Sequence, residues 1–293
     1  MIKNCENLTL EENRMDFLKS VLLFLQTPME VPIPYGWFHI TWLILTVVAT
    51  VLLCVFHKKD KPERVRLIVL FTALVVIAFE IYKQIVWNFS VTDEGIAFSY
   101  NWQIFPFQFC STPMYAGLIA GLTKKGRIHD AFCAYLATYS IFAGLCVMLT
   151  VGDVFMYMAG INVQTMVCHG SMIAIGIYLL YSGHIKLEHK TIFKAMAVFA
   201  GCLTIAVIMN EIAYYTGLLE KSVFNMFFVS PYQAGTLPVY SDIIQPNVPY
   251  PWCLIIYVAA FSLAAYLILL VAMGIKALAR RIKNRKEKFY EKA

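Results

Sequence analysis

The chain has 293 residues, of which 60% are hydrophobic and only 14% are charged, and its mean hydropathy is +0.66. A water-soluble domain of this length needs a more polar surface, so the composition excludes an ordinary soluble globular protein. The formal net charge is +6 at pH 7, but the basic residues follow apolar segments directly, which indicates membrane topology and does not favour nucleic-acid binding.

The first predicted element is an N-terminal helix that lies on the outer surface of the membrane. The stretch LTLEENRMDFLKSVLLFLQTP, residues 8–28, has acidic residues early and an apolar face later, and Pro28 ends it. Its apolar part is too short for a signal peptide and has no cleavage pattern. We therefore expect an interfacial helix within an outer segment of residues 1–35.

Seven apolar stretches follow, each about long enough to cross the hydrocarbon core of a bilayer. Because lipid cannot satisfy open backbone groups, we expect these stretches to be helices and the fold class to be an all-α membrane protein with seven transmembrane helices. In chain order, the predicted spans are 37–56, 66–87, 104–122, 131–150, 161–182, 193–216 and 251–275. They make up one membrane domain, residues 36–276, followed by a basic cytoplasmic tail, residues 277–293.

Lysine and arginine residues orient this bundle. They gather in the loops after the first, third and fifth spans and in the tail, whereas the alternate loops carry almost none. The positive-inside rule then places the N-terminus outside and the C-terminus in the cytoplasm.

The longest outer loop, residues 217–250, is rich in Phe, Tyr and Pro. Such aromatic content favours a position at the membrane interface, over the end of the bundle. Long loops are often functional lids. A lid and an aromatic cover without chemistry are both open interpretations of this loop.

Polar and ionisable side chains concentrate in the outer halves of five spans. A helix rises about 1.5 Å per residue, and by this measure these residues share one depth. Ionisable groups in a bilayer usually face the bundle interior or a water-filled cavity, so we predict a polar cavity toward the outer leaflet. Its candidate residues are His39, Glu80, Lys83, Gln108, Cys110, Gln164, His169, Asn210 and Glu211.

Several of these residues also have a purely structural interpretation. Glu80 and Lys83 are three positions apart and can neutralise each other on one helix face. Asn210 and Glu211 can join helices by hydrogen bonds. A Cys in a membrane helix is usually a small apolar residue, and a single His is more often a hydrogen-bonded structural residue.

The stretch FPFQFCSTPMY, residues 105–115, contains the strongest candidate for chemistry. Its Cys110 precedes Pro113, which lacks a backbone donor and tends to kink a helix. His169 lies at a comparable depth in QTMVCHGSM, where Gly170 leaves room for a ligand. An apolar thiol needs a base or a positive neighbour to become a thiolate, and Cys with His is the minimal pair for covalent acyl transfer.

Other residues at this depth are candidates for supporting roles. Gln108, Lys83 and Asn210 could orient the His or stabilise an oxyanion. The sequence shows no paired Cys or His spacing typical of a metal site and no glycine-rich nucleotide motif, so neither a metal nor a cofactor is predicted.

Three motifs carry a resemblance to a known family. The stretches FPFQFCSTPMY, MVCHGSM and PNVPYPWCLIIY together resemble the YwaF-type bacterial integral membrane proteins. These are similar to the transmembrane protein 164 family of phospholipid acyltransferases and, more distantly, to the androgen-induced hydrolases of fatty-acid esters. The resemblance covers residues 37–275. It implies acyl-lipid chemistry with Cys110 as nucleophile and His169 as its partner, while the Thr nucleophile of the ester-hydrolase branch makes Thr112 a second candidate.

Two functional hypotheses follow. The first is a lipid acyltransferase or lipid-ester hydrolase of the bacterial cytoplasmic membrane, with a phospholipid or lysophospholipid as its partner. The alternative is a non-enzymatic transporter or small-ligand binding protein, with Glu80, Lys83 and Glu211 as contacts in the same cavity. Contact between thiol and imidazole would favour the enzyme, and a cavity that continues toward the cytoplasm would favour transport.

Overall fold

The structure is a computed structural model that describes residues 2–57, 61–151 and 154–290, with only the backbone described for residues 2–12, 286, 289 and 290. Within these residues it is mostly helical, and six helices are long and apolar enough to cross a membrane. This confirms the prediction of an all-α membrane protein, while the seven-span count and the orientation stay predictions.

The elements follow the order predicted from the sequence. The helices are α1 Ile2–Leu25, α2 Trp37–Phe56, α3 Pro62–Asn88, α4 Thr112–Leu122, α5 Arg127–Tyr135, α6 Ile141–Leu149, α7 Ala159–Tyr181, α8 Lys190–Tyr215, α9 Gln245–Asn247 and α10 Tyr250–Tyr290. A two-stranded antiparallel hairpin, β1 Phe89–Thr92 and β2 Gly95–Phe98, follows α3. The shorter helical segments are η1 Trp102–Ile104, the π segment η2 Leu136–Ser140, η3 Leu218–Glu220, η4 Met226–Phe228 and η5 Tyr240–Ile244.

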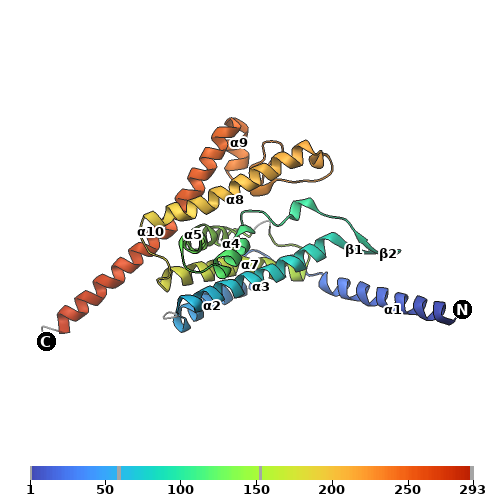
Figure 1. Cartoon of the computed structure of the whole chain (residues 1–293), viewed down its shortest axis with the longest axis horizontal. Coiled ribbons are helices and arrows are strands. Elements are labelled where there is room, and N and C mark those ends of the chain that lie inside the picture. Colours follow the sequence, from blue (N-terminus) through green and yellow to red (C-terminus); the bar gives the residue numbers. More distant parts are fainter. Residues whose placement is uncertain (1, 58–60, 152–153, 291–293) are drawn as a thin grey trace.

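The helices form three layers (Figure 1). α2 and α3 lie on one side, α4, α5 and α7 lie in the middle, and α8 with α10 lies on the other side. The middle layer is the most buried. In α7, 72% of the most apolar stretch is buried, and in the span Arg127–Leu149 the corresponding share is 67%. The corresponding share is between 17% and 28% for α2, α3, α8 and α10, so these helices present apolar side chains to the surroundings, as lipid-facing helices do.

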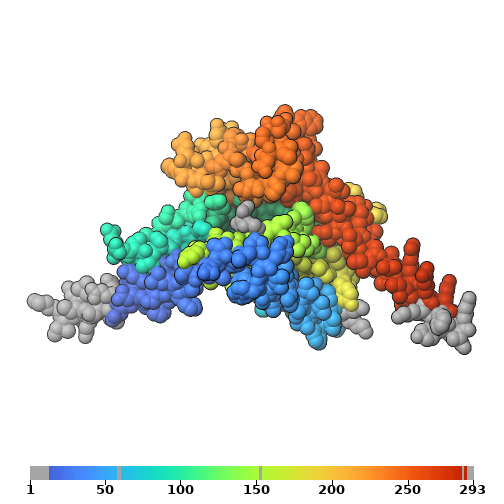
Figure 2. Space-filling view, turned by 180° about the vertical axis from the view of Figure 1, so that it is seen from behind, coloured from blue at the N-terminus to red at the C-terminus, as the bar shows by residue number. Residues whose placement is uncertain are grey.

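The two ends of the chain project from opposite ends of the bundle (Figures 1 and 2). α1 ends at Leu25, before Pro28, as the sequence predicts. α10 is a single helix of 41 residues that runs from the predicted last span into the basic tail. The interfacial position of α1 and the domain boundaries stay predictions.

The third predicted span is only partly helical. Residues 104–111 form the end of η1 and irregular chain, and α4 begins at Thr112 and has 11 residues. At 1.5 Å per residue this is about 16 Å, roughly half of the hydrocarbon core. Pro113 lies in the first turn of α4, where its missing donor costs nothing. The predicted kink at Pro113 is therefore wrong, and Cys110 lies just before the N-terminus of a helix.

Glycines on α7 allow its neighbours to approach closely. A Cβ added at Gly176 would overlap the side chain of Ile141 and lie 2.6 Å from the carbonyl oxygen of Leu136. A Cβ added at Gly144 on α6 would lie 2.8 Å from the carbonyl oxygen of His169. The contact between α7 and the span Arg127–Leu149 therefore has no room for a side chain at these positions.

Gly176→Ala should lower the free energy of unfolding by about 1–3 kcal/mol, as is typical of an overpacked core. Gly201→Ala on α8 is the matched control, because nothing lies within 4 Å of its added Cβ. It should be neutral or slightly stabilising, since Ala favours helix over Gly. Thermal unfolding of the detergent-solubilised variants measures both, and equal midpoints for the two would contradict the described packing.

Candidate functional site

Cys110 lines a narrow, mainly apolar groove along the seam between α3 and α4. The groove is also bordered by the π segment η2 and by α7. Its water-accessible volume is about 20 Å³, room for about one water molecule. The polar residues among its walls are Thr72, Cys110, Ser140 and Ser171.

Cys110 lies next to the start of a helix. Ser111, the N-cap of α4, follows it directly, and this end of the helix carries a partial positive charge. The backbone N–H groups of Ser111, Thr112 and Met114 already have carbonyl partners, and Pro113 has no N–H. The charges of Glu80 and Lys83 on α3 act on the Cys110 thiol with opposite signs.

His169 on α7 has one ring nitrogen engaged and one free of partners. Its Nδ1 donates to the backbone oxygen of Thr165 at 2.7 Å, because a carbonyl can only accept. This fixes the tautomer of a neutral ring, so that Nε2 carries the lone pair. Nε2 is buried and has no hydrogen-bond partner among the described residues. Buried polar atoms nearly always have a partner. Among the described residues this nitrogen is one of six buried side-chain atoms without one, together with Ser140 Oγ, Gln245 Oε1 and the hydroxyls of Tyr240, Tyr250 and Tyr257.

An ion pair on α3 lies near both candidates. Glu80 and Lys83 are 2.8 Å apart, and the charge of Lys83 acts on His169 as well as on Cys110. The thiol does not bond to His169 Nε2, which has no partner. The thiol and the imidazole are therefore not hydrogen-bonded to each other, although the Lys83 charge acts on both. Catalytic hydrogen bonds often form only when a substrate binds.

Two amides on α3 that the sequence analysis did not single out extend this polar region. Gln84 donates to the Glu80 carboxylate at 2.8 Å and to the backbone oxygen of Ile104 at 3.0 Å. Asn88 accepts from the backbone N–H of Asn101 at 2.7 Å. Glu80, Gln84 and Asn88 follow one another at four-residue spacing, which places them on one helix face and is the signal that could have found them.

Gln108 and Asn210 hold the outer loop instead of contacting the thiol. Gln108 donates to the oxygen of Asn225 and accepts from the N–H of Phe227, both at 2.9 Å. Asn210 donates to the oxygen of Met226 at 3.0 Å and accepts from its N–H at 2.7 Å. The two amides thus clamp three consecutive loop residues by their backbone groups.

The clamped loop covers the residue next to Cys110. Phe227 has φ of 58°, in the left-handed region that a bulky residue rarely adopts. Its side chain is fully buried, and its ring centroid lies 5.8 Å from that of Phe109. Strained backbone of this kind persists only where surrounding contacts hold it, and it is common at ligand clamps. The loop is therefore a fastened aromatic cover, and its opening as a lid stays a prediction.

His39 and Thr112 have their polar atoms engaged away from Cys110. His39 accepts from the N–H of Tyr35 and donates to the oxygen of Met148, which joins α2 to the end of α6. The Thr112 hydroxyl donates to a backbone carbonyl three residues earlier and pairs with the Tyr135 hydroxyl at 2.6 Å. Its proton and one lone pair are thus already in use.

Gln164 and Glu211 also have local partners. The Gln164 amide donates to the sulfur of Cys168 at 3.5 Å. The Glu211 carboxylate accepts from the Tyr232 hydroxyl at 2.8 Å, and Tyr232 stacks on Tyr214 at 3.7 Å. Glu211 therefore fastens the outer loop to α8 from a second point.

A separate cluster lies near the other end of α4. His129 and Cys133 on α5 and His184 after α7 place their ligating atoms within 4.8 Å of one another. The sequence analysis predicted no metal site and named none of these residues. His129 and Cys133 are four positions apart, which puts both on one helix face, and this spacing was the overlooked signal.

Comparison with known proteins gives one match. A family model described as the TMEM164 family matches residues 34–274, from just before α2 into α10, a range that includes Cys110 and His169. No curated protein and no solved structure matches the chain significantly.

Asn210→Ala should loosen the outer loop, because two buried backbone groups of Met226 lose their partners at a cost of about 1–3 kcal/mol. Lys221 is the only Lys or Arg in residues 217–250, so trypsin reports on this loop by cleavage at one position. Cleavage should become about 5- to 100-fold faster, in line with that cost. Asn247→Ala, which removes one exposed bond to the oxygen of Ile243, is the control and should change little. Equal cleavage rates in the two variants would argue against the clamp.

Proposed function

Because the chain belongs to the TMEM164 family of multi-pass membrane proteins, we propose that it is a lipid acyltransferase or lipid-ester hydrolase. Cys110 is its nucleophile and His169 its general base. The observation that supports this most is the buried lone pair of His169 Nε2, which has no partner among the described residues and is subject to the same Lys83 charge as the Cys110 thiol. A purely structural His would use both ring nitrogens, as His39 does.

The reaction proceeds in two halves. His169 Nε2 takes the thiol proton, and the Cys110 sulfur attacks the carbonyl carbon of an acyl ester. The C–O bond to the lipid alcohol then breaks, and the alcohol leaves with the proton from His169. In the second half, a lysolipid hydroxyl or water gives its proton to His169 and attacks the thioester, which releases the acyl group and restores the thiol.

Lys83 supports this chemistry by its charge. Its ammonium acts on both the thiol and the imidazole, and it would stabilise the negative oxygen that forms on the acyl carbon. Glu80 holds Lys83 by the ion pair, and Gln84 holds Glu80 in turn. These residues position the cation and do not react themselves.

The groove supports a lipid substrate over a polar solute. Its wall on α3 extends from Val69 to Val76, which is about 10 Å of helix. Met114 and Met172 narrow it, and these flexible side chains can move to admit an acyl chain. A transported ion or polar metabolite would need polar walls, and the described groove has few.

Two features of the sequence support a location for the reaction. The resemblance to YwaF-type proteins and the distribution of basic residues favour the bacterial cytoplasmic membrane, with Cys110 toward the outer leaflet. The substrate class that fits is a phospholipid donor with a lysophospholipid or water as acceptor.

The test is acyl release and transfer from phospholipid in proteoliposomes, followed by mass spectrometry of the lipids. Cys110→Ala should abolish turnover, and His169→Gln should lower it about 10²- to 10⁴-fold, the usual contribution of a general base. Cys168→Ala removes a neighbouring buried thiol and is the matched control, which should retain most of the activity. Full turnover in Cys110→Ala would end the proposal.

A further inference from the structure

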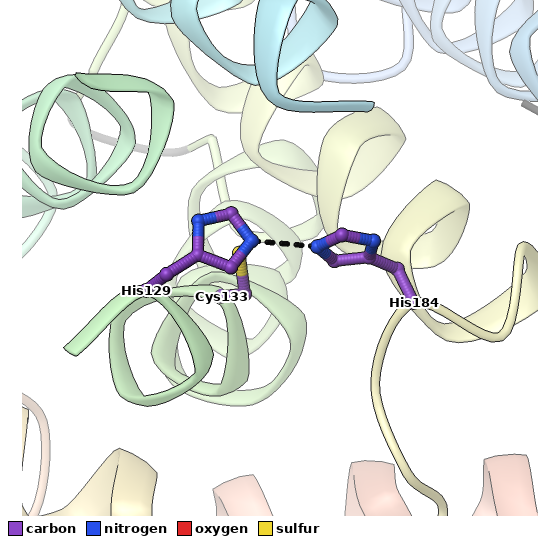
Figure 3. Close-up of side chains that lie close together, drawn as sticks. All are labelled: His129, Cys133 and His184. Carbon is purple, nitrogen blue, oxygen red and sulfur yellow. Dashed lines mark hydrogen bonds between the residues drawn. The ribbon is translucent and has the colours of Figure 1, made fainter. Parts of the chain in front are cut away.

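Three metal-ligating side chains point toward one another at the boundary between α5 and the α7–α8 loop (Figure 3). His129 Nε2 lies 2.6 Å from His184 Nε2 and 3.5 Å from the Cys133 sulfur. His129 is fully buried and Cys133 nearly so, while His184 is partly buried. Imidazole and thiolate are the ligands that zinc prefers in proteins.

The backbone holds His129 in the orientation that a metal ligand needs. Its Nδ1 donates to the oxygen of Ala120 on α4 at 2.8 Å, so Nε2 keeps its lone pair and faces the other two side chains. Metal-ligating His residues usually donate their second ring N–H to a carbonyl or carboxylate in this way. This bond is the independent observation that distinguishes the cluster from a chance contact.

The contact between the two histidines assigns their ring protons. With His129 Nε2 as acceptor, His184 Nε2–H is the donor of the 2.6 Å bond. A metal replaces this proton, which moves through solvent to Nδ1, and it also displaces the thiol proton of Cys133.

The two distances from His129 lie within about 1 Å of those of a tetrahedral ion, and all three ligating atoms lie within 4.8 Å of one another. Zinc ligation puts nitrogen and sulfur ligands about 3.6 Å apart and two nitrogens about 3.3 Å apart. The His129–Cys133 separation of 3.5 Å already meets the first value, and the His129–His184 separation must widen by about 0.7 Å to meet the second. His184 lies in a partly exposed loop segment, which can move by this amount more easily than a helix.

We propose that His129, Cys133 and His184 form a binding site for one divalent transition-metal ion, with Zn²⁺ as the best fit. The ion takes two imidazole nitrogens and one thiolate from the protein and keeps a fourth position for water. It cross-links α5 to the loop between α7 and α8 and so stabilises this end of the bundle. The basic residues of the loops place this end on the cytoplasmic side.

This site is separate from the proposed acyl-transfer site. Cys110 precedes the N-terminus of α4, whereas His129 contacts Ala120 near its C-terminus. Within α4, the eight steps from Thr112 to Ala120 correspond to about 12 Å of helix rise. Loss of the metal is therefore expected to lower stability without removing the thiol and imidazole of the acyl-transfer site.

The experiment is metal analysis of the full chain, purified in detergent without a polyhistidine tag, loaded with Zn²⁺ and freed of excess ion. We expect about one Zn²⁺ per chain and a higher thermal midpoint than after chelation. With Co²⁺ instead, Cys133 should give a thiolate-to-metal charge-transfer band in the near ultraviolet.

The variants His184→Ala and Cys133→Ser should lose this stoichiometric binding, and Cys133→Ser should lose the charge-transfer band. His189→Ala changes a His in the same loop that bonds to the Tyr266 hydroxyl, and Cys202→Ala removes a thiol outside the cluster; both should keep one ion per chain. Absence of bound metal in the unchanged protein would overturn the proposal. Retention of one tightly bound ion per chain by His184→Ala or by Cys133→Ser would do so as well.

Discussion

In a hydrocarbon environment every backbone polar group needs a partner inside the protein, and side chains supply several of these partners to the mostly non-helical residues 104–111. Irregular chain at membrane depth persists only where protein covers it or where it lines a cavity. Here Gln84 satisfies the oxygen of Ile104, and Gln108 bonds to the outer loop above. The helix that follows can therefore start in mid-bundle, with Cys110 at its N-terminus. The arrangement of the candidate site depends on this unusual start.

Most of the polar layer then serves to hold the structure. Gln108 and Asn210 fasten the loop, His39 joins two helix ends, and Thr112 bonds to Tyr135. Each of these polar groups has a hydrogen-bond partner, which offsets the free-energy cost of its burial. His169 differs, because its Nε2 lone pair is buried without a partner. The His169 Nε2 atom lacks a hydrogen-bond partner, whereas the Gln108 and Asn210 amides are hydrogen-bonded to the loop. This contrast distinguishes the proposed catalytic residue from its structural neighbours.

Sequence patterns predicted the all-α membrane fold, because apolar length is a local property of the chain. They did not predict which polar residues serve structure. The partners of Gln108 lie 117 and 119 positions away and are backbone atoms, which carry no sequence signal. Pro113 was misread for a similar reason: a Pro inside an apolar run indicates a kink, but at a helix start it is neutral. The cluster at His129 needed a third ligand 55 positions away, and only the α5 half of it was visible as a four-residue spacing.

The central claim is that the Cys110 sulfur becomes acylated. Peptide mass spectrometry of the protein after incubation with phospholipid, quenched in acid, tests it directly. The account predicts an acyl mass on the peptide that contains Cys110, which neutral hydroxylamine removes because a thioester is cleaved under those conditions. The peptide that contains Cys168 should carry none. An unmodified Cys110 in protein that turns over lipid, or an acyl mass on another residue, would contradict the account.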